Sequence, residues 1–249
     1  MDKNLKLYYE EFHLKTREMP IEIMKQQSRI KVLKELLPTK KGDNNILFVG
    51  CGTGDELLII KENKELVIGL DISYTALRKA KMKNQNFIFI QGDAHYIPFR
   101  KNSFNIIICS EVLEHLSNAE KCISEIYRVL REQGIFILTV PNWISLFGLF
   151  RKVGEIIIQS KLTSDNQPID NWFTPSKLRN LIKKYFTIIE DRGIWYYPPT
   201  GKGGRRIPDK FIYPVFNFLM PLNNSLSKII PNFGHCLALK CQKRTIKRI

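Results

Sequence analysis

ILFVGCGTGD, residues 46–55, is the stretch that decides the fold of this chain of 249 residues. Four apolar residues in a row are typical of a buried strand, and the glycine-rich run that follows predicts a tight loop before a helix. Glycine has no Cβ, so the backbone of such a loop can approach a ligand closely. The loop is therefore of a nucleotide-binding type.

The residue at position 55 distinguishes this loop from a dinucleotide-binding loop. A G-x-G-x-x-G fingerprint that starts at Gly50 would have its third glycine where this chain has Asp55. A carboxylate at the N-terminus of a helix competes with the pyrophosphate that such a loop normally holds. Asp55 instead favours a ligand that carries an ammonium or sulfonium charge.

Two further carboxylates follow the next predicted strands. Asp71 lies about 20 residues after Gly50, which is the spacing at which an acidic residue accepts hydrogen bonds from ribose hydroxyls. Asp93 follows the third predicted strand, where its side chain can accept a hydrogen bond from the exocyclic amine of adenine while Ala94 offers a backbone donor. Together, the loop and the two aspartates indicate an adenosine-containing ligand.

Short apolar runs alternate with helical stretches outward from this motif. Strands are predicted at 46–49, 66–70, 87–90, 106–109, 135–140, 186–190 and 236–241, and helices near 55–62, 74–83, 118–131 and 174–185. One or two further helices are predicted within residues 5–37. The alternation is typical of an α/β fold with a doubly wound parallel sheet and helices on both faces.

Composition excludes several classes of protein. The chain has 44% hydrophobic residues and 39 Lys and Arg against 24 Asp and Glu, so it is neither a collagen nor a disordered tail. Its five cysteines contain no C-x-x-C pair, which excludes a zinc ribbon and favours reduced thiols in the cytoplasm. No segment approaches the ~18 apolar residues of a membrane span.

The net charge of +15 is unevenly distributed, because residues 200–249 hold ten Lys and Arg and one acid. A basic segment of this kind favours nucleic acid, anionic lipid or an acidic substrate as a partner. The alternative is that these lysines are solvated surface residues that have no partner. Both interpretations stay open at this point.

The ordered set of motifs resembles the class I S-adenosylmethionine-dependent methyltransferases, especially the group that includes the ubiquinone and menaquinone biosynthesis enzymes. The segments that carry the resemblance are ILFVGCGTGD (46–55), LVIGLDIS (66–73), GDAHYIPF (92–99), FNIIICSEVLEHL (104–116) and LREQGIFILTVPN (130–142). It implies a Rossmann-like sheet of seven strands, mostly parallel with an antiparallel last strand. It also implies S-adenosylmethionine as cofactor.

The resemblance assigns roles to individual residues. The loop glycines approach the methionine portion, Asp55 lies near its ammonium group, and Asp71 takes the ribose diol. Ile72 packs against adenine, whose edge Asp93 and Ala94 hold, and Ser110 lines the cofactor near the sulfonium. The complete set of predicted cofactor-binding residues is Gly50, Cys51, Gly52, Gly54, Asp55, Asp71, Ile72, Asp93, Ala94 and Ser110.

His115 is the candidate catalytic residue, because a base with a pKa near neutrality helps if the methyl acceptor is a phenol or an enol. The alternative is that His115 is hydrogen-bonded and only shapes its loop. Glu111, Glu114 and His115 also match an E-x-x-E-H string that binds a divalent metal in some related enzymes. Too few ligands are present for tight binding, so no metal site is predicted.

The acceptor site is expected in the segments outside these motifs. Candidates are Tyr8, Tyr9 and Phe12, the aromatic run at 143–150, and Trp195, Tyr196 and Tyr197, although aromatic residues more commonly pack in a core. The basic loop at 201–206 can bind phosphate or an anionic lipid head group. The predicted organisation is an N-terminal helical cap, 1–40, and a methyltransferase domain, 41–249, with a lid or substrate insertion at about 191–235.

The leading hypothesis is methyl transfer to a small or lipid-like metabolite, with residues 143–150 and 211–222 receiving an aliphatic tail or resting on a membrane surface. A second hypothesis takes RNA as acceptor through the basic residues after position 239. A nicotinamide-dependent oxidoreductase is disfavoured by Asp55, and a non-catalytic cofactor-binding module is a further alternative. The acceptor and the oligomeric state are not indicated by the sequence.

Overall fold

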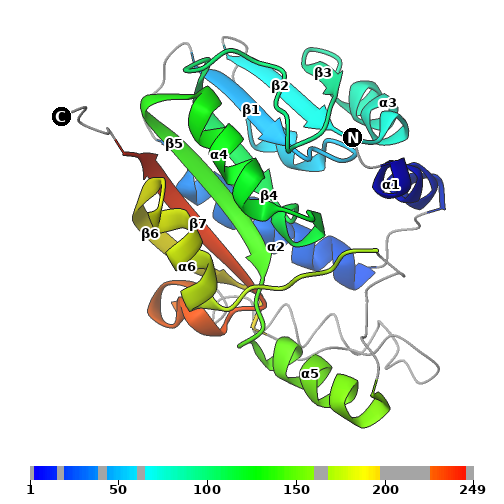
Figure 1. Cartoon of the computed structure of the whole chain (residues 1–249), viewed down its shortest axis with the longest axis vertical. Helices are drawn as coiled ribbons and strands as arrows, with labels where there is room; N and C mark the ends of the chain where they lie inside the picture. The colour runs from blue at the N-terminus through cyan, green and yellow to red at the C-terminus, as the bar shows by residue number, and fades with distance from the viewer. Residues whose placement is uncertain are drawn as a thin grey trace.

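The computed structural model describes residues 3–15, 20–38, 44–60, 65–159, 168–196 and 225–244. They form a seven-stranded sheet in the order β3-β2-β1-β4-β5-β7-β6 (Figure 1). The strands are β1 (Asn45–Val49), β2 (Leu66–Asp71), β3 (Ile88–Gln91), β4 (Phe104–Ser110), β5 (Leu130–Pro141), β6 (Phe186–Ile194) and β7 (Cys236–Lys243). Strands β1 to β5 pair in parallel, whereas β7 is antiparallel to β5 and β6. The predicted fold class is confirmed.

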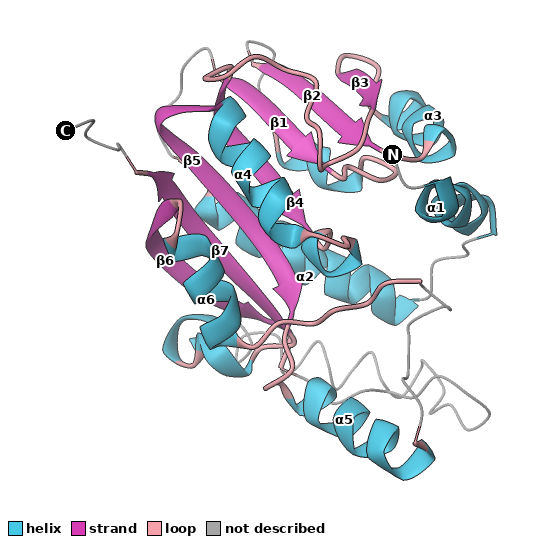
Figure 2. Cartoon of the chain, viewed as in Figure 1, coloured by secondary structure: helices cyan, strands magenta, loops and turns pink. Residues whose placement is uncertain are grey.

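The central strands are apolar on both faces, because helices cover the sheet on both sides (Figure 2). Side chains alternate between the faces of a strand. In β1, Leu47 and Val49 belong to one buried cluster, whereas Ile46 and Phe48 belong to the other. The continuous apolar run at 46–49 therefore supplies two separate hydrophobic layers.

Each layer is completed by helices. Helices α4 (Ala119–Val129) and α6 (Pro175–Lys183) contribute to the first cluster, and α2 (Pro20–Leu36) contributes Leu33 and Leu36 to the second. Helix α3 (Tyr74–Lys83) lies against β2 and β3, and α1 (Lys3–Lys15) packs on α3 at the same side of the molecule (Figure 1). Helices α1 and α2 therefore occupy different parts of the fold.

Two segments differ from the prediction. Residues 55–60, the described part of the helix predicted near 55–62, do not form an α-helix; they contain the short 3₁₀ helix η1 (Asp55–Ile59), which begins directly after Gly54 in a left-handed conformation. The aromatic run at 143–150, for which the sequence predicts no helix, leads into α5 (Leu146–Ile158). Ser145 caps α5, because its hydroxyl accepts a hydrogen bond from the Gly148 N–H at 3.0 Å.

The predicted insertion at 191–235 is described only in part. β6 continues to Ile194, so the first residues of that range are strand, and residues 197–224 lie outside the described residues. At the other end, residues 225–229 are helical and η4 (Pro231–Phe233) precedes β7. A lid at this position stays a prediction, as does the boundary at residue 40. Among the described helices, none combines the length and the apolarity needed to cross a bilayer.

Candidate functional site

The glycine loop connects β1 to η1 at the carboxyl edge of the sheet. The N–H groups of Gly50 and Cys51 both donate to the carbonyl of Leu70, at 2.7 and 3.0 Å, so the loop folds back onto the end of β2. Gly50, Gly52 and Gly54 have φ angles of 69°, 51° and 80°. These left-handed conformations carry no steric penalty for glycine, which explains three glycines within five residues.

The three glycines face different surroundings. A Cβ on Gly50 would lie 2.3 Å from a Val112 methyl group, and a Cβ on Gly54 would lie 2.9 Å from the Cβ of Ala80. Among the described residues, a Cβ on Gly52 would meet nothing closer than a ring carbon of His13, at 4.0 Å. Gly50 and Gly54 therefore permit close packing within the protein, whereas Gly52 borders space that a ligand can enter.

Cys51 lines the inner side of the same loop. A Cβ on Gly69 would lie 2.8 Å from the Cys51 sulfur, so the thiol packs over the middle of β2. Burial raises the pKa of the Cys51 thiol, and the charge of Asp71 raises it further. Cys51 is therefore a packing residue that stays protonated, which suits contact with an apolar part of a ligand.

Asp71 links the loop to the end of β2. Its Oδ2 accepts the Gly52 N–H at 2.7 Å and its Oδ1 accepts the Ser73 N–H at 2.9 Å. Burial raises the pKa of Asp71, and the two N–H donors and His13 oppose that rise. Each carboxylate oxygen retains a lone pair beyond these bonds, so Asp71 can also accept hydrogen bonds from a diol.

Each carboxylate oxygen of Asp55 has a hydrogen-bond partner within the protein. Lys83 Nζ lies 2.6 Å from Oδ1, and the Thr53 hydroxyl donates to Oδ2 at 2.6 Å. Burial would raise the pKa of Asp55, but the hydrogen bonds from Lys83 and Thr53 outweigh it and the pKa is lowered. The structure therefore places the Asp55 carboxylate against α3, where Lys83 neutralises it.

The predicted adenine-binding residues Asp93 and Ala94 lie after β3. β2 and β3 run parallel with Asp71 opposite Gln91, so Ile72 and Asp93 are brought to the same edge. Asp93 Oδ1 accepts the His95 N–H at 2.9 Å and lies 2.7 Å from His95 Nδ1. Ala94 packs against the first hydrophobic cluster. Among the described residues, no partner is present for the buried His95 Nε2.

Sequence reasoning missed a polar network beneath Ser110. The Ser110 hydroxyl donates to Glu56 Oε1 at 3.0 Å, and Arg29 Nε donates to the same oxygen at 2.5 Å. Arg29 Nη1 lies 4.0 Å from Glu111 Oε2. Desolvation would lower the pKa of Arg29, but Glu56 and Glu111 outweigh it and raise that pKa. No spacing in the sequence distinguishes Arg29 from the other basic residues of its helix.

His115 ends the short 3₁₀ helix η2 (Leu113–His115) just after β4. Its Nδ1 lies 3.2 Å from the Ile169 carbonyl, which can only accept, so Nδ1 carries the proton and Nε2 is the basic nitrogen. Burial lowers the pKa of His115, although Ile169 and two acidic residues oppose the shift. His115 is therefore neutral near pH 7 and able to accept a proton.

Glu114 is 1% exposed, and within the described residues its Oε2 has no hydrogen-bond partner. Its Oε1 lies 3.6 Å from His115 Nε2, which is too long for a hydrogen bond. Burial raises the pKa of Glu114 well above its ordinary range, and the charge of Glu111 adds to the effect. An unpaired buried carboxyl group of this kind is stabilised by a ligand that donates to it.

Helix α1 covers this edge of the sheet. The Glu10 carboxylate accepts hydrogen bonds from the backbone N–H groups of Tyr74 and Thr75, at 2.7 and 2.8 Å, so α1 is attached to the N-terminus of α3. The Tyr9 ring lies 6.0 Å from the His115 ring, edge to face. The Tyr9 hydroxyl is buried, and in the described part of the chain nothing bonds to it.

Comparisons with known proteins identify the family to which the chain belongs. The family profile described as "Methyltransferase domain" matches residues 47–138. An uncharacterized protein of Methanocaldococcus jannaschii is 32% identical over 187 residues, which cover 71% of this chain and 72% of the relative. The ubiquinone/menaquinone biosynthesis C-methyltransferase of Blochmanniella floridana is 32% identical over 134 residues, which cover 46% of this chain and 53% of that enzyme. The chain belongs to the type 11 family of class I S-adenosylmethionine-dependent methyltransferases.

The solved structure of an S-adenosylmethionine-dependent methyltransferase from Thermotoga maritima supports the fold of the methyltransferase. It matches with a TM-score of 0.62 at 17% identity and covers 88% of this chain and 89% of its own. Because the chain belongs to this methyltransferase family, S-adenosylmethionine is its cofactor. The structure fits this donor: among the described residues a Cβ on Gly52 would meet only His13, at 4.0 Å, Asp71 accepts the N–H of this glycine, and the buried His95 Nε2 beside Asp93 has no partner.

The aromatic residues expected in the acceptor site have different surroundings in the methyltransferase. Tyr9 lies beside His115, as described above. Trp195 is 1% exposed and belongs to the second hydrophobic cluster, so it packs in the core, which is the alternative to a place in the acceptor site. The Tyr196 hydroxyl donates to the carbonyls of Leu226 and Ile230, at 3.0 and 3.1 Å. Tyr197 and residues 201–206 lie outside the described residues.

Trp143 packs with Trp172, whose ring centroid lies 5.3 Å away. Trp172 donates from Nε1 to Asp170 Oδ1 at 2.8 Å, and Asp170 follows the Ile169 carbonyl that orients His115. These contacts connect the aromatic run after β5 to the candidate base. Within the residues that the structure describes, no group of three or more His, Cys, Asp or Glu side chains is arranged to hold a metal ion.

Proposed function

We propose that the enzyme transfers the methyl group of S-adenosylmethionine to a small or lipid-like metabolite, with His115 accepting the proton that leaves the acceptor. One observation carries this proposal: His115 and Glu114 are enclosed beneath α1, with the Tyr9 ring 6.0 Å from the His115 ring. A covered site of this kind admits a small molecule or one chain of a lipid more readily than a folded macromolecule.

The donor half of the proposed site consists of the glycine loop and the carboxylates after β2 and β3. Asp71 would receive the ribose diol, Ile72 would contact adenine, and Asp93 with Ala94 would hold the adenine edge, as the family resemblance implies. The space beside Gly52 would receive the methionine portion. Asp55 is a weaker part of this assignment, because Lys83 already neutralises its carboxylate at 2.6 Å.

The acceptor half consists of Tyr9, Glu114 and His115. When bound, the cofactor supplies a methyl group on a positively charged sulfur, so the protein needs mainly to position the acceptor and to exclude water. His115 Nε2 would take the proton from a hydroxyl or enol acceptor, while Nδ1–H stays bonded to the Ile169 carbonyl at 3.2 Å. The Tyr9 hydroxyl and Glu114 Oε2 would bond to polar groups of the bound acceptor.

The RNA hypothesis is disfavoured by the position of the basic C-terminus. Lys243 is 5% exposed and donates to the Leu130 carbonyl at 2.6 Å and to Asn102 Oδ1 at 2.8 Å. Because β7 is antiparallel to β5, Lys243 lies near the amino end of β5, at the sheet edge opposite His115. Lys247 and Arg248 lie outside the described residues.

Methyl-labelled cofactor provides the test. The purified enzyme is incubated with labelled S-adenosylmethionine and fractionated cell extract, and the label is followed into small-molecule, lipid, RNA and protein fractions. We expect label in the small-molecule or lipid fraction, and His115→Ala should reduce it while binding of the demethylated cofactor is retained. Label that enters only RNA or protein would contradict the proposal, and so would full activity of His115→Ala.

A further inference from the structure

Helix α5 exposes apolar side chains of the kind that an ordinary surface helix buries. In α5 the Arg151 side chain is only 7% exposed. Leu149, Val153, Ile156 and Ile157 are 49%, 54%, 68% and 75% exposed. Their spacing of i, i+4, i+7 and i+8 places all four on one face of the helix.

The contacts of Arg151 hold α5 in this orientation. Arg151 donates to Asp170 Oδ2 at 2.8 Å and to Glu155 Oε1 at 3.1 Å. Its guanidinium lies 5.1 Å from the centre of the Trp143 ring and 4.5 Å from that of Trp172. These charge and ring contacts fix the rotation of the helix, so that Leu149, Val153, Ile156 and Ile157 are directed toward solvent.

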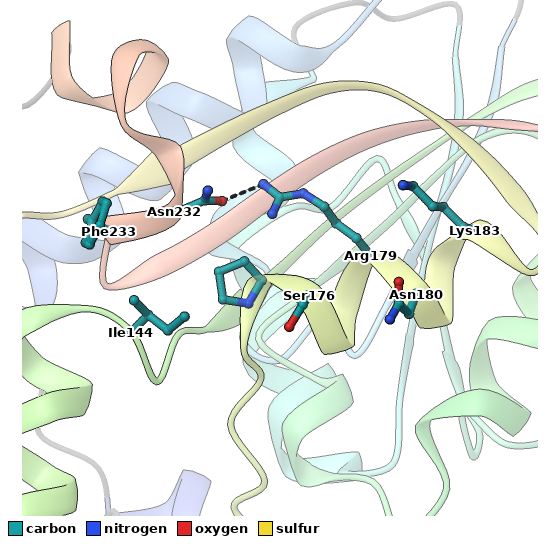
Figure 3. A pocket seen from close by; sticks show the side chains of 8 residues that line it. Ile144, Ser176, Arg179, Asn180, Lys183, Asn232 and Phe233 are labelled. Carbon is teal, nitrogen blue, oxygen red and sulfur yellow. Dashed lines mark hydrogen bonds between the residues drawn. The ribbon is translucent and has the colours of Figure 1, made fainter.

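A cavity of about 470 Å³ lies beside the start of α5, between α6 and η4. Figure 3 shows Arg179 directed toward Asn232, with Lys183 further along α6 and with Ile144 and Phe233 at the opposite end. Arg179 also donates to Asp191 Oδ2 at 2.6 Å. The cavity therefore has a basic end and an apolar end.

The charge around this cavity is positive. The ranges 144–159, 175–183 and 225–233 contain six Lys and Arg and a single acid, Glu155, which pairs with Arg151; from outside these ranges, Asp170 also pairs with Arg151 and Asp191 pairs with Arg179. Lys152, Lys183 and Lys228 have no ion-pair partner among the described residues. Ile229 and Phe233, which are 73% and 54% exposed, extend the apolar surface on the η4 side.

We infer that this face of the protein, formed by the apolar side of α5 and the cavity between α6 and η4, attaches the protein to membranes that contain anionic lipid. Exposed apolar side chains next to lysines match the two layers of a bilayer surface, the acyl boundary and the negative head groups. Lys183 holds lipid phosphate at the cavity, since Arg179 is already paired with Asp191, and the isoleucines of α5 enter the interface. Nucleic acid carries the same negative charge but has no apolar layer into which the isoleucines could insert. Attachment goes beyond the proposed methyl transfer and does not require it.

Vesicle sedimentation with the full chain tests this inference. We expect binding to vesicles of phosphatidylcholine with phosphatidylglycerol, and much less binding to phosphatidylcholine alone. The double variant Ile156→Ser, Ile157→Ser and the single variant Lys183→Glu should each weaken binding at least about tenfold. The matched controls Met82→Ser, at a side chain 78% exposed on α3, and Lys101→Glu should bind as the parent does.

Several results would overturn the inference. Equal binding to neutral and anionic vesicles would do so, as would isoleucine variants that bind as tightly as the parent. The face would instead be a nucleic-acid site if Lys183→Glu abolished the binding of a single-stranded RNA oligomer while the isoleucine variant left vesicle binding unchanged. Calorimetry with S-adenosylhomocysteine should be unchanged in every variant, so loss of attachment stays distinguishable from failure of the methyltransferase assignment.

Discussion

The side chain of Asp71 accepts the backbone N–H of Gly52 at 2.7 Å, so the residue that ends β2 holds the loop that follows β1. Its other oxygen accepts the Ser73 N–H at 2.9 Å, at the N-cap of α3. One carboxylate thus orders two loops on either side of the donor site. A ligand that bonds to this carboxylate therefore binds beside a glycine loop whose conformation the Asp71 hydrogen bond already fixes.

Replacing Asp71 with alanine should weaken the binding of S-adenosylhomocysteine by about 1–3 kcal/mol, or roughly 5- to 150-fold, because charge-assisted hydrogen bonds and loop order are both lost. Isothermal calorimetry measures the change. Glu120→Ala removes a carboxylate that pairs with exposed Lys184 and serves as the control with unchanged affinity. Wild-type affinity in Asp71→Ala would remove this residue from the ribose role.

Tyr9→Phe should leave the apo protein as stable as the parent or raise its free energy of unfolding by about 1 kcal/mol, because the buried hydroxyl has no described partner. Methyl transfer should nevertheless fall if that hydroxyl bonds to the acceptor. Tyr196→Phe is the matched comparison, since its hydroxyl donates to two carbonyls, and it should lower the free energy of unfolding by about 1 kcal/mol. Urea unfolding and labelled transfer give the two readouts.

The rate of methyl transfer should rise with pH through the pKa of His115, and the midpoint of the rise should lie below the ordinary value of 6.5, because burial lowers that pKa. A base must be unprotonated to act, so the loss of rate lies on the acidic side. The profile of His115→Ala should lack this limb. An unaltered limb in the variant would assign the titration to another group.

Buried His235 should make the protein sensitive to acid. Burial, followed by the charges of Lys25 and Arg29, lowers its pKa to about 3, whereas the unfolded chain binds a proton near pH 6.5. The stabilising contribution is therefore complete above about pH 6.5 and is lost as pH falls toward about 3. Urea unfolding at several pH values should show a shallower pH dependence for His235→Asn. Parallel curves for the two proteins would contradict this.

Arg29→Met should lower the free energy of unfolding by about 2–3 kcal/mol, because Glu56 and Glu111 lose the cation that lies between them. The expected loss is smaller than for a fully buried pair, since the Arg29 side chain is 20% exposed. Arg131→Met, whose guanidinium bonds at the exposed surface, is the control. Thermal and urea unfolding measure the difference.

The central sheet could be predicted well because its signals are local. The apolar run at 46–49, the glycines at 50–54 and the two aspartates lie within short segments that fold according to their own pattern, and β1 begins within one residue of its predicted start. The sequence also indicated His115 as the candidate base. Its neutral tautomer was not predictable, because the partner of Nδ1 is the carbonyl of Ile169, far along the chain.

The sequence by itself determined the succession of the seven strands, the glycine loop with its carboxylates, and hence the family and the cofactor, because these depend on neighbours in the chain. Only the tertiary structure decided that α1 covers His115, that Arg29 lies between two glutamates, that Trp195 is core and that α5 directs its apolar face outward. Each of these results from contacts between segments distant in the chain. The periodicity of a helix shows which side chains share a face, but contacts with other segments decide which face is directed toward the core.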